Sequence, residues 1–322
     1  MRRVKIGIIF VGLLTGLILG TFAFAQERGV TISPLNFELT ANPGDSLENK
    51  IRVSNPTTSN VSIKMEVEDF TASGEIGQVI VEKTEDTTYS LKRWVKINPA
   101  EFTLKPGEQK FVTFTINVPK NAEPGGKYGS ILAVITGVAG PGTIGTGITT
   151  KVGALVLLAV SGDVKEEINV EGFSAPKFSE YGPINFVIRL KNTGTVHLRP
   201  RGLVTITNIF GSQVANVEFA QQNVIPGAIR RIEAKWDEGW LWGLKYQATL
   251  VGSYGSQNNP ISAVTTFWVF PWKVVLLAII ILSLIIYFAV RTVRKVKRAE
   301  EILKQKKMEE EKKNQGNPPK VV

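Results

Sequence analysis

Few side chains in this sequence could carry out catalysis or hold a metal ion. The chain has one histidine, His197, and no cysteine, so it offers neither the usual ligand set of a zinc site nor a thiol nucleophile. A carboxylate pair such as Glu66 and Asp69 could assemble in space, but nothing in the sequence singles it out. We expect no catalytic residues, no metal and no cofactor, and interpret His197 as a structural residue of a turn.

Tryptophan side chains are the better candidates for binding. Trp236, Trp240 and Trp242 cluster in and beside the segment DEGWLWGL, where a strand pattern breaks. Exposed aromatic side chains in a loop can stack on sugars or anchor a protein partner. The alternative is that they close the end of a β-sandwich or lie near a membrane. We therefore name these three tryptophans as candidate partner-binding residues.

A C-terminal apolar stretch marks a membrane segment. Seventeen uncharged residues run from Val274 to Val290, about 26 Å as a helix, which is close to the thickness of the hydrocarbon layer. Trp272 suits the outer rim, and Arg291, Arg294 and Lys295 follow at once. Because basic residues stay on the cytoplasmic side, we predict a transmembrane helix at 272–292, a basic cytoplasmic tail at 293–322 and an extracytoplasmic body before them.

The N-terminus is typical of a secretory signal peptide. Basic residues precede an apolar run at 6–19, and the small residues Ala23 and Ala25 follow. We predict a signal peptide at 1–25 that is cleaved between Ala25 and Gln26; the alternative is an uncleaved N-terminal anchor. Either form exports the body of the chain.

The basic charge follows these membrane segments. Of the net charge of +10, residues 1–25 carry +3 and residues 274–322 carry +6, which leaves +1 on the exported body. Basic residues at these places set topology and attract anionic lipid headgroups. Nucleic acid is therefore not a supported partner.

The exported body has the sequence pattern of an all-β protein. Short runs of alternating apolar residues, such as 61–67, 112–118 and 184–190, are separated by turns rich in Pro, Gly and Asn. Pro34 interrupts the first run and suits an edge strand that bends or switches sheets. Residues 152–160 (VGALVLLAV) are apolar on both faces but too few to cross a bilayer as a helix, so we predict a central strand buried on both faces.

Landmarks recur in the same order in two halves of the body. Asn55 and Asn192 each follow an alternating strand, and the pairs Pro106-Gly107 and Pro226-Gly227 each precede another. Tyrosines at 128 and 246 open a late strand in each half, as corner tyrosines or ordinary strand residues. We predict two tandem immunoglobulin-like β-sandwiches, at 26–163 and 164–271, with an additional hairpin between 70 and 94 in the first.

These segments resemble the WxL-interacting protein family of Gram-positive cell-surface proteins. The first half has Asn55-Pro56-Thr57, then Trp94, then KPGEQKFVTFTINVPKNAEPGGKYGSIL at 105–132. The second has KNTGTVHLRPRGLVTITNIFGSQV at 191–214, and the family's Asn-x-Gly-x-x-His-Pro-Gly pattern falls loosely on Asn192, Gly194, His197, Pro200 and Gly202. The family layout of signal peptide, two sandwiches, membrane helix and lysine-rich tail matches the chain from end to end.

The resemblance implies a non-catalytic binding or scaffolding protein of the cell surface. The first domain would bind peptidoglycan or a WxL protein, and the second would bind partner or host proteins. The expected partners are secreted or surface proteins, peptidoglycan, and the lipid bilayer through the C-terminal helix, with neither nucleic acid nor a small-molecule substrate. The alternative is a membrane-tethered chaperone or assembly subunit for surface fibres, because the opening strands also resemble pilus-chaperone sandwiches.

The tryptophan hypothesis makes a direct prediction. Trp240→Ala should weaken retention of the protein by cell-wall preparations without lowering its melting temperature, because an exposed binding residue contributes little to the core. Pull-down and thermal unfolding measure the two effects. Unchanged retention would contradict a binding role for this residue.

Overall fold

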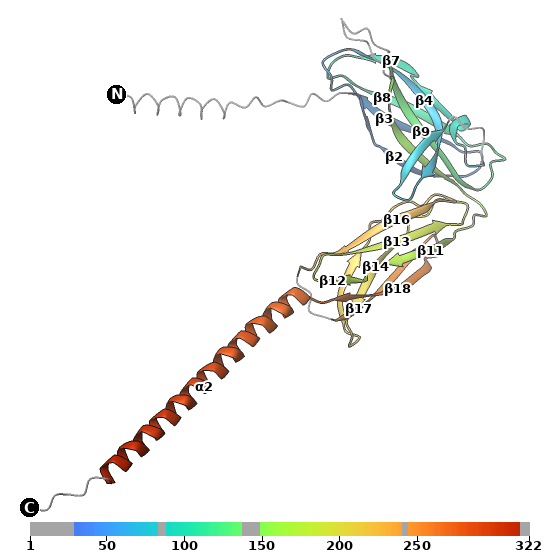
Figure 1. Cartoon of the computed structure of the whole chain (residues 1–322). Coiled ribbons are helices and arrows are strands. Elements are labelled where there is room, and N and C mark those ends of the chain that lie inside the picture. The colour runs from blue at the N-terminus through green and yellow to red at the C-terminus, as the bar shows by residue number, and fades with distance from the viewer. Residues whose placement is uncertain (1–28, 83–87, 137–148, 240–243, 316–322) are drawn as a thin grey trace, which may run out of the picture.

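The protein consists of two β-sandwiches in tandem followed by one long helix that extends away from the second sandwich (Figure 1). This computed structural model describes residues 29–82, 88–136, 149–239 and 244–315. Four sheets make up the two sandwiches. The predicted fold class, all-β with two tandem immunoglobulin-like domains and a C-terminal helix, is confirmed.

The first sandwich packs a four-stranded sheet against a six-stranded one. The four-stranded sheet has the order β1 (Thr31–Ser33), β3 (Ser46–Ser54), β8 (Gln109–Asn117), β6 (Val95–Asn98). The other has the order β2 (Asn36–Ala41), β10 (Thr149–Val160), β9 (Gly125–Thr136), β4 (Val61–Ser73), β5 (Gln78–Glu82), with β7 (Glu101–Leu104) also paired to β4. A short 3-10 helix, η1 (Lys92–Trp94), precedes β6.

The second sandwich repeats this plan with fewer strands. One sheet has the order β11 (Ile168–Ser174), β13 (Ile184–Asn192), β16 (Ile229–Trp236). The other has the order β12 (Phe178–Ser179), β18 (Asn259–Val269), β17 (Lys245–Tyr254), β14 (Arg201–Thr207), β15 (Gln213–Glu218). The strands β6 and β7 and the helix η1 of the first sandwich have no counterpart among the described strands here.

In both sandwiches the chain enters one sheet and then changes to the other. β1 pairs antiparallel with β3, and after Pro34 the chain continues as β2, which pairs parallel with β10. β11 and β12 do the same with β13 and β18. Proline lacks a backbone N–H for the sheet, which suits a point of exchange between sheets. The sheet switch predicted at Pro34 is confirmed.

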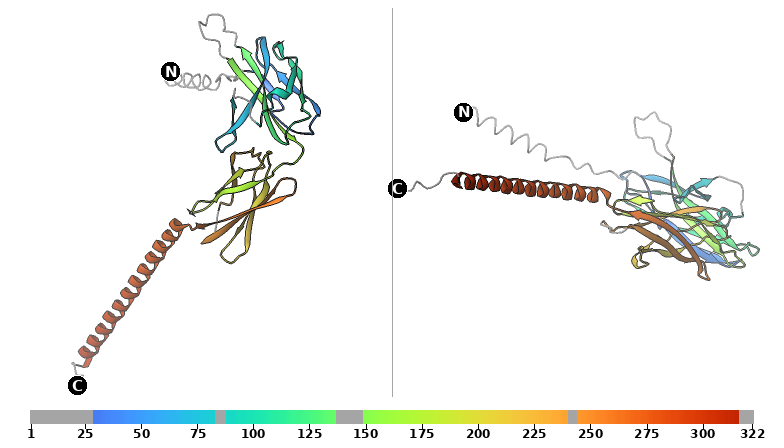
Figure 2. Two further views of the ribbon diagram at one scale, coloured as in Figure 1. Left: turned by 90° about the vertical axis from the view of Figure 1, so that its right-hand side faces the viewer. Right: turned by 60° about the horizontal axis from the view of Figure 1, so that its bottom comes forward.

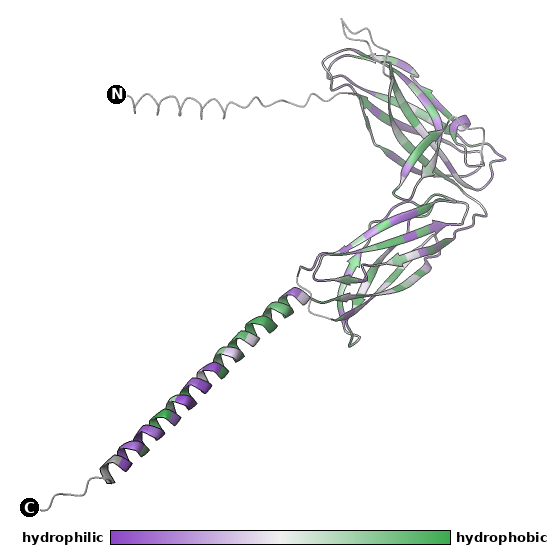
Figure 3. Cartoon of the chain, in the orientation of Figure 1, coloured by the Kyte–Doolittle hydropathy of each residue, from purple (hydrophilic) through white to green (hydrophobic). Residues whose placement is uncertain are grey.

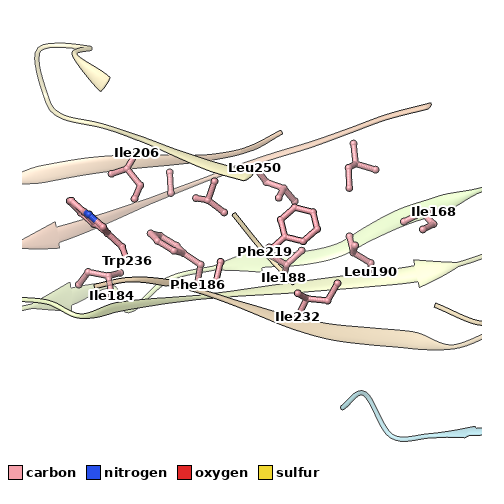
Figure 4. Packing of buried hydrophobic residues seen from close by; sticks show 14 of the residues in the cluster. Ile168, Ile184, Phe186, Ile188, Leu190, Ile206, Phe219, Ile232, Trp236 and Leu250 are labelled. Atoms are coloured by element: carbon pink, nitrogen blue, oxygen red, sulfur yellow. The ribbon is translucent and has the colours of Figure 1, made fainter. Parts of the chain in front are cut away.

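Alternation along the strands builds the two cores. In β13, Ile184, Phe186, Ile188 and Leu190 are fully buried and alternate with more exposed neighbours, as the two-residue period of a strand requires. These side chains pack between the sheets of the second sandwich (Figure 4), where the Phe186 ring meets that of Phe267 edge-on at 5.7 Å. Burial of each such side chain contributes about 1.5–3 kcal/mol to stability.

Two buried asparagines fix equivalent turns in the two sandwiches. Asn192 Nδ2 donates to the carbonyl oxygens of Val196 and Val224 at 2.8 and 2.7 Å, and its Oδ1 accepts from Gly194 N at 2.8 Å. Asn55 occupies the same place in the first sandwich, where Nδ2 donates to Leu104 O at 3.1 Å. Each amide therefore links backbone groups of two segments that meet at the turn.

The C-terminal helix begins directly after the last strand. α2 (Trp272–Gln315) has 44 residues, about 66 Å at the usual helical rise, and is long and apolar enough to be a candidate membrane span. Figure 3 shows that its apolar stretch starts next to the second sandwich and gives way to a hydrophilic second half. The helix continues without a break through the basic residues after Val290.

Because Asn192 holds two loops at once, its loss should be costly. Asn192→Leu keeps a similar volume but removes the hydrogen bonds to Val196 O and from Gly194 N, and one of the two that Val224 O accepts, so we expect the free energy of unfolding of the second sandwich to fall by about 2–5 kcal/mol. Denaturant titration followed by tryptophan fluorescence measures this change, since Trp236 lies in that core. Gln257→Ala, on the exposed surface of the same sandwich, serves as the control and should alter stability by less than about 0.5 kcal/mol.

Candidate functional site

A cleft of about 360 Å³ lies where the two sandwiches meet. Its first wall is the outer face of the six-stranded sheet, from β2 to β5, and its second wall is the loop between β15 and β16. Figure 1 and the left view of Figure 2 show the two sandwiches joined end to end, and residues of both line the cleft.

The floor of the cleft is apolar. Phe70, Leu155 and Leu157 line it, and Phe70 and Leu157 form a small cluster with Tyr128. Ile225 of the second sandwich packs against this cluster. On the outer face of β10, Leu157 is buried and Leu155 and Ala159 are half-buried against the second sandwich, which explains why 152–160 is apolar on both sides. The predicted burial on both faces is therefore complete on the inner face and partial on the outer one.

One polar wall centres on Glu38 of β2. Its carboxylate accepts from Asn223 Nδ2 at 2.6 Å and pairs with Arg199 at 3.4 Å, so one acidic group of the first sandwich holds two side chains of the second. The Oδ1 atom of Asn223 is buried and has no hydrogen-bond partner among the described residues. A buried acceptor without a donor costs free energy, and a ligand hydroxyl or amide N–H could satisfy it once the Asn223 side chain turned toward the cleft.

Arg230 supplies a positive charge at the other side of the cleft. Its Nε donates to Gln222 Oε1 at 2.7 Å, and its guanidinium lies so close to Gly77 that any side chain there would collide with it. Partial burial lowers the pKa of Arg230 from its usual value, but an arginine remains charged at neutral pH. The planar group can therefore donate hydrogen bonds to carboxylate or carbonyl oxygens of a ligand.

On one flank of the cleft, two glycines bring the backbones of the domains together. Gly126 N donates to Thr195 O at 2.8 Å, and a Cβ at Gly125 would lie 2.9 Å from that same oxygen. Gly125 also has a φ of +127°, which other residues avoid. Beside this contact the Tyr128 hydroxyl lies 3.4 Å from His197 Nδ1. Burial raises the pKa of Tyr128 and lowers that of His197, so both are neutral at pH 7.

On the other flank, the tip of the β4–β5 hairpin reaches the second sandwich. Glu75 O accepts from Arg231 N at 2.7 Å, and the Glu75 carboxylate takes two hydrogen bonds from the Arg189 guanidinium, one of them from Nε at 2.8 Å. These bonds lower the pKa of Glu75. The hairpin thereby closes part of the open edge of β16, and the cleft lies between two fixed contacts.

The arrangement suits recognition of a polar chain. The cleft offers an apolar floor, a positive group at Arg230 and an acceptor at Asn223. Asp69 is occupied elsewhere, because its carboxylate accepts from Ser90 Oγ at 2.5 Å and from the backbone N–H groups of Leu91 and Lys92 at 2.9 Å. Glu66 pairs with Lys64 and Lys151, at 3.3 Å each.

The structure places the predicted site residues in different parts of the molecule. Trp236 is buried in the second core, with its ring 5.5 Å from that of Tyr246, so we assign it to the core and not to a binding surface. Trp240 and Trp242 lie outside the described residues, as do Ala25 and Gln26. Trp272, Arg291, Arg294 and Lys295 lie on α2 and are exposed.

The cleft residues escaped the sequence interpretation. Glu38, Asn223 and Arg230 are far apart in the chain, and nothing in their types or spacing joins them. The strand at 152–160 was the one signal in the sequence for this junction. Its second apolar face predicts that another part of the protein covers it. Tyr128 is also not a corner tyrosine bonded to its own sandwich, since its hydroxyl meets His197.

The domain contact at His197 should depend on pH. Because its pKa in the folded protein is below the ordinary value of 6.5, the unfolded chain binds a proton more readily than the folded one. Stability from this site is complete above about pH 6.5 and falls as the pH drops toward the lower folded pKa. His197→Gln cannot titrate, so its melting temperature should fall less than that of the wild type between pH 7.5 and 5.5. Identical pH profiles would contradict this role.

Comparison with known proteins finds a family match in the first sandwich. Residues 30–134 match the family described as WxL Interacting Protein, peptidoglycan binding domain. No curated protein matches the chain.

Several solved structures are distantly similar to this chain. They include a chain from a chaperone–tip adhesin complex of CFA/I fimbriae biogenesis (14% identity, TM-score 0.39), the class 5 fimbriae chaperone CfaA (12%, 0.37) and the Pseudomonas aeruginosa CupB2 chaperone (10%, 0.34). Each covers 74% of this chain and 98%, 99% and 100% of its own length, respectively. Likenesses this distant say nothing about function. The family model matches residues 30–134, about a third of the chain, and the rest of the chain lies outside the match.

Proposed function

We propose that this protein is a membrane-anchored, non-catalytic binding protein of the cell envelope that engages peptidoglycan or a WxL surface protein. The family match over residues 30–134 carries this proposal. The chemistry of the cleft supports it, because peptidoglycan and extended peptides both present amide groups and carboxylates to which Arg230 and Asn223 are complementary.

The organisation of the chain follows from the same proposal. A signal peptide at 1–25 is cleaved after Ala25, the sandwiches occupy 26–163 and 164–271, and a transmembrane helix at 272–292 leads to a cytoplasmic tail at 293–322. The apolar first part of α2 and the basic residues from Arg291 onward support this orientation, with the sandwiches outside the membrane. The first sandwich is then held away from the bilayer by the second.

Binding through the cleft predicts a defined loss in two variants. Arg230→Gln and Asn223→Ala should each weaken binding by about tenfold, because a hydrogen bond to a charged or desolvated group contributes roughly 1.5–3 kcal/mol. Co-sedimentation of the detergent-solubilised full chain with purified peptidoglycan, and pull-down with a WxL surface protein, measure the affinity. Arg52→Gln, an exposed arginine on β3 in the other sheet, is the matched control.

The outcomes separate the parts of the proposal. Wild-type protein that retains neither ligand would overturn the proposed function. Retention that the cleft variants do not alter would move the site to another surface of the first sandwich. Transient capture of unfolded surface subunits, in place of folded protein or peptidoglycan, would favour the alternative of an assembly chaperone.

A further inference from the structure

The turn between β14 and β15 exposes apolar side chains where a polar turn would be expected. Phe210 is 84% exposed and Ile209 is 54% exposed. Single exposed apolar residues are common on protein surfaces, but adjacent ones at a hairpin tip need a reason.

This turn has a defined conformation. Asn208 Oδ1 accepts from the backbone N–H groups of Phe210 and Ser212 at 2.9 and 3.0 Å, and Gly211 N donates to Asn208 O at 3.0 Å. Gly211 has a φ of +78°, which glycine adopts without strain. The two apolar side chains are therefore presented by a hydrogen-bonded turn, so little backbone conformational entropy is lost when they are buried.

The turn lies beside the first turn of α2. Ile209 and Phe210 line an open, mainly apolar hollow of about 310 Å³ together with Leu244, Phe270, Pro271 and Val275. Val275 belongs to the uncharged stretch of α2 that begins at Val274. The hairpin tip is therefore level with the start of the apolar part of the helix.

Contacts fix the helix start to the second sandwich. Lys273 forms an ion pair with Glu180 at 2.9 Å, and Phe270 N donates to Ser179 O at 3.0 Å. Only Phe270 and Pro271 lie between the last residue of β18, Val269, and the first helical residue, Trp272. The hairpin and the helix should thus meet a membrane surface together.

Other exposed aromatic side chains gather at this end of the second sandwich. Phe178 and Trp268 are register partners on the parallel strands β12 and β18, and both are about half exposed. Tyr181 and Trp272 are exposed nearby in the chain. Tryptophan and tyrosine are enriched at membrane–water interfaces because one part of the ring system is apolar and another is polar.

We propose that this end of the second sandwich is a second membrane contact, in which Ile209 and Phe210 enter the headgroup region of the lipid bilayer beside α2. The inference rests on the proposed anchoring by α2 and adds a lipid-binding surface on the folded domain. Two contacts instead of one would fix the angle between the sandwiches and the membrane, which a single helix cannot do.

The absence of cysteine from the chain makes a sharp test available. Three single-cysteine variants of the full chain, Phe210→Cys, Val275→Cys and Phe111→Cys, are labelled with a fluorophore and placed in nanodiscs of phosphatidylcholine and phosphatidylglycerol. Phe111 is a matched exposed aromatic on the first sandwich. We expect nitroxide-bearing lipids to quench the labels at 210 and 275 several-fold more than the label at 111.

Each outcome decides one point. Quenching at 275 but not at 210 would overturn the membrane contact of the hairpin and leave the anchoring by α2 intact. Quenching at neither position would overturn the proposed anchoring as well. A label at 210 that is shielded from aqueous iodide but not quenched by lipid would show that protein, such as a second copy of the chain, covers the turn, and this would also overturn the inference.

Discussion

The amide of Asn192 is the constraint on which the functional arrangement depends. It lies at the end of β13, fully buried, and binds both the loop that carries Thr195 and His197 and the loop that carries Ile225 and the walls of the cleft. Val224 O also accepts from Leu198 N at 3.1 Å, so the Asn192 side chain adds a second tie between the two loops. Asn192 thus holds together two loops of the second sandwich that both contact the first.

A buried asparagine holds the equivalent turn in both sandwiches, but only Asn192 lies at the junction between them. Asn55 fixes the equivalent turn of the first sandwich by binding Ser59 O and Leu104 O, and neither of these residues lines the cleft. Asn192 faces the junction, where the glycines at 125 and 126 let a backbone approach closely. Contacts at Glu75 and Glu38 then add charge pairs on exposed or half-exposed groups, which contribute more to orientation than to stability.

The two ends of the second sandwich present opposite chemistry. The end toward the first sandwich has a cleft with Glu38, Arg199 and Arg230 around it, whereas the end toward α2 exposes aromatic and aliphatic side chains. The end with the cleft suits a hydrated, polar ligand, and the end toward α2 suits a lipid interface. A domain with these two ends can hold a binding module at a set distance and angle from a membrane.

The sequence by itself determined the strands, the sheet switch at Pro34 and the apolar helix, because these follow from local periodicity and from the backbone limits of proline. It also indicated the family, whose motifs are turn residues close together in the chain. Only the tertiary structure decided the site. Glu38 and Asn223 are brought together across a domain junction, and Trp236 is drawn into the core because its neighbours in space, Tyr246 and Phe267, come from other strands. Burial and contact between distant residues depend on how sheets pack, and no pattern of residues along the chain specifies that packing.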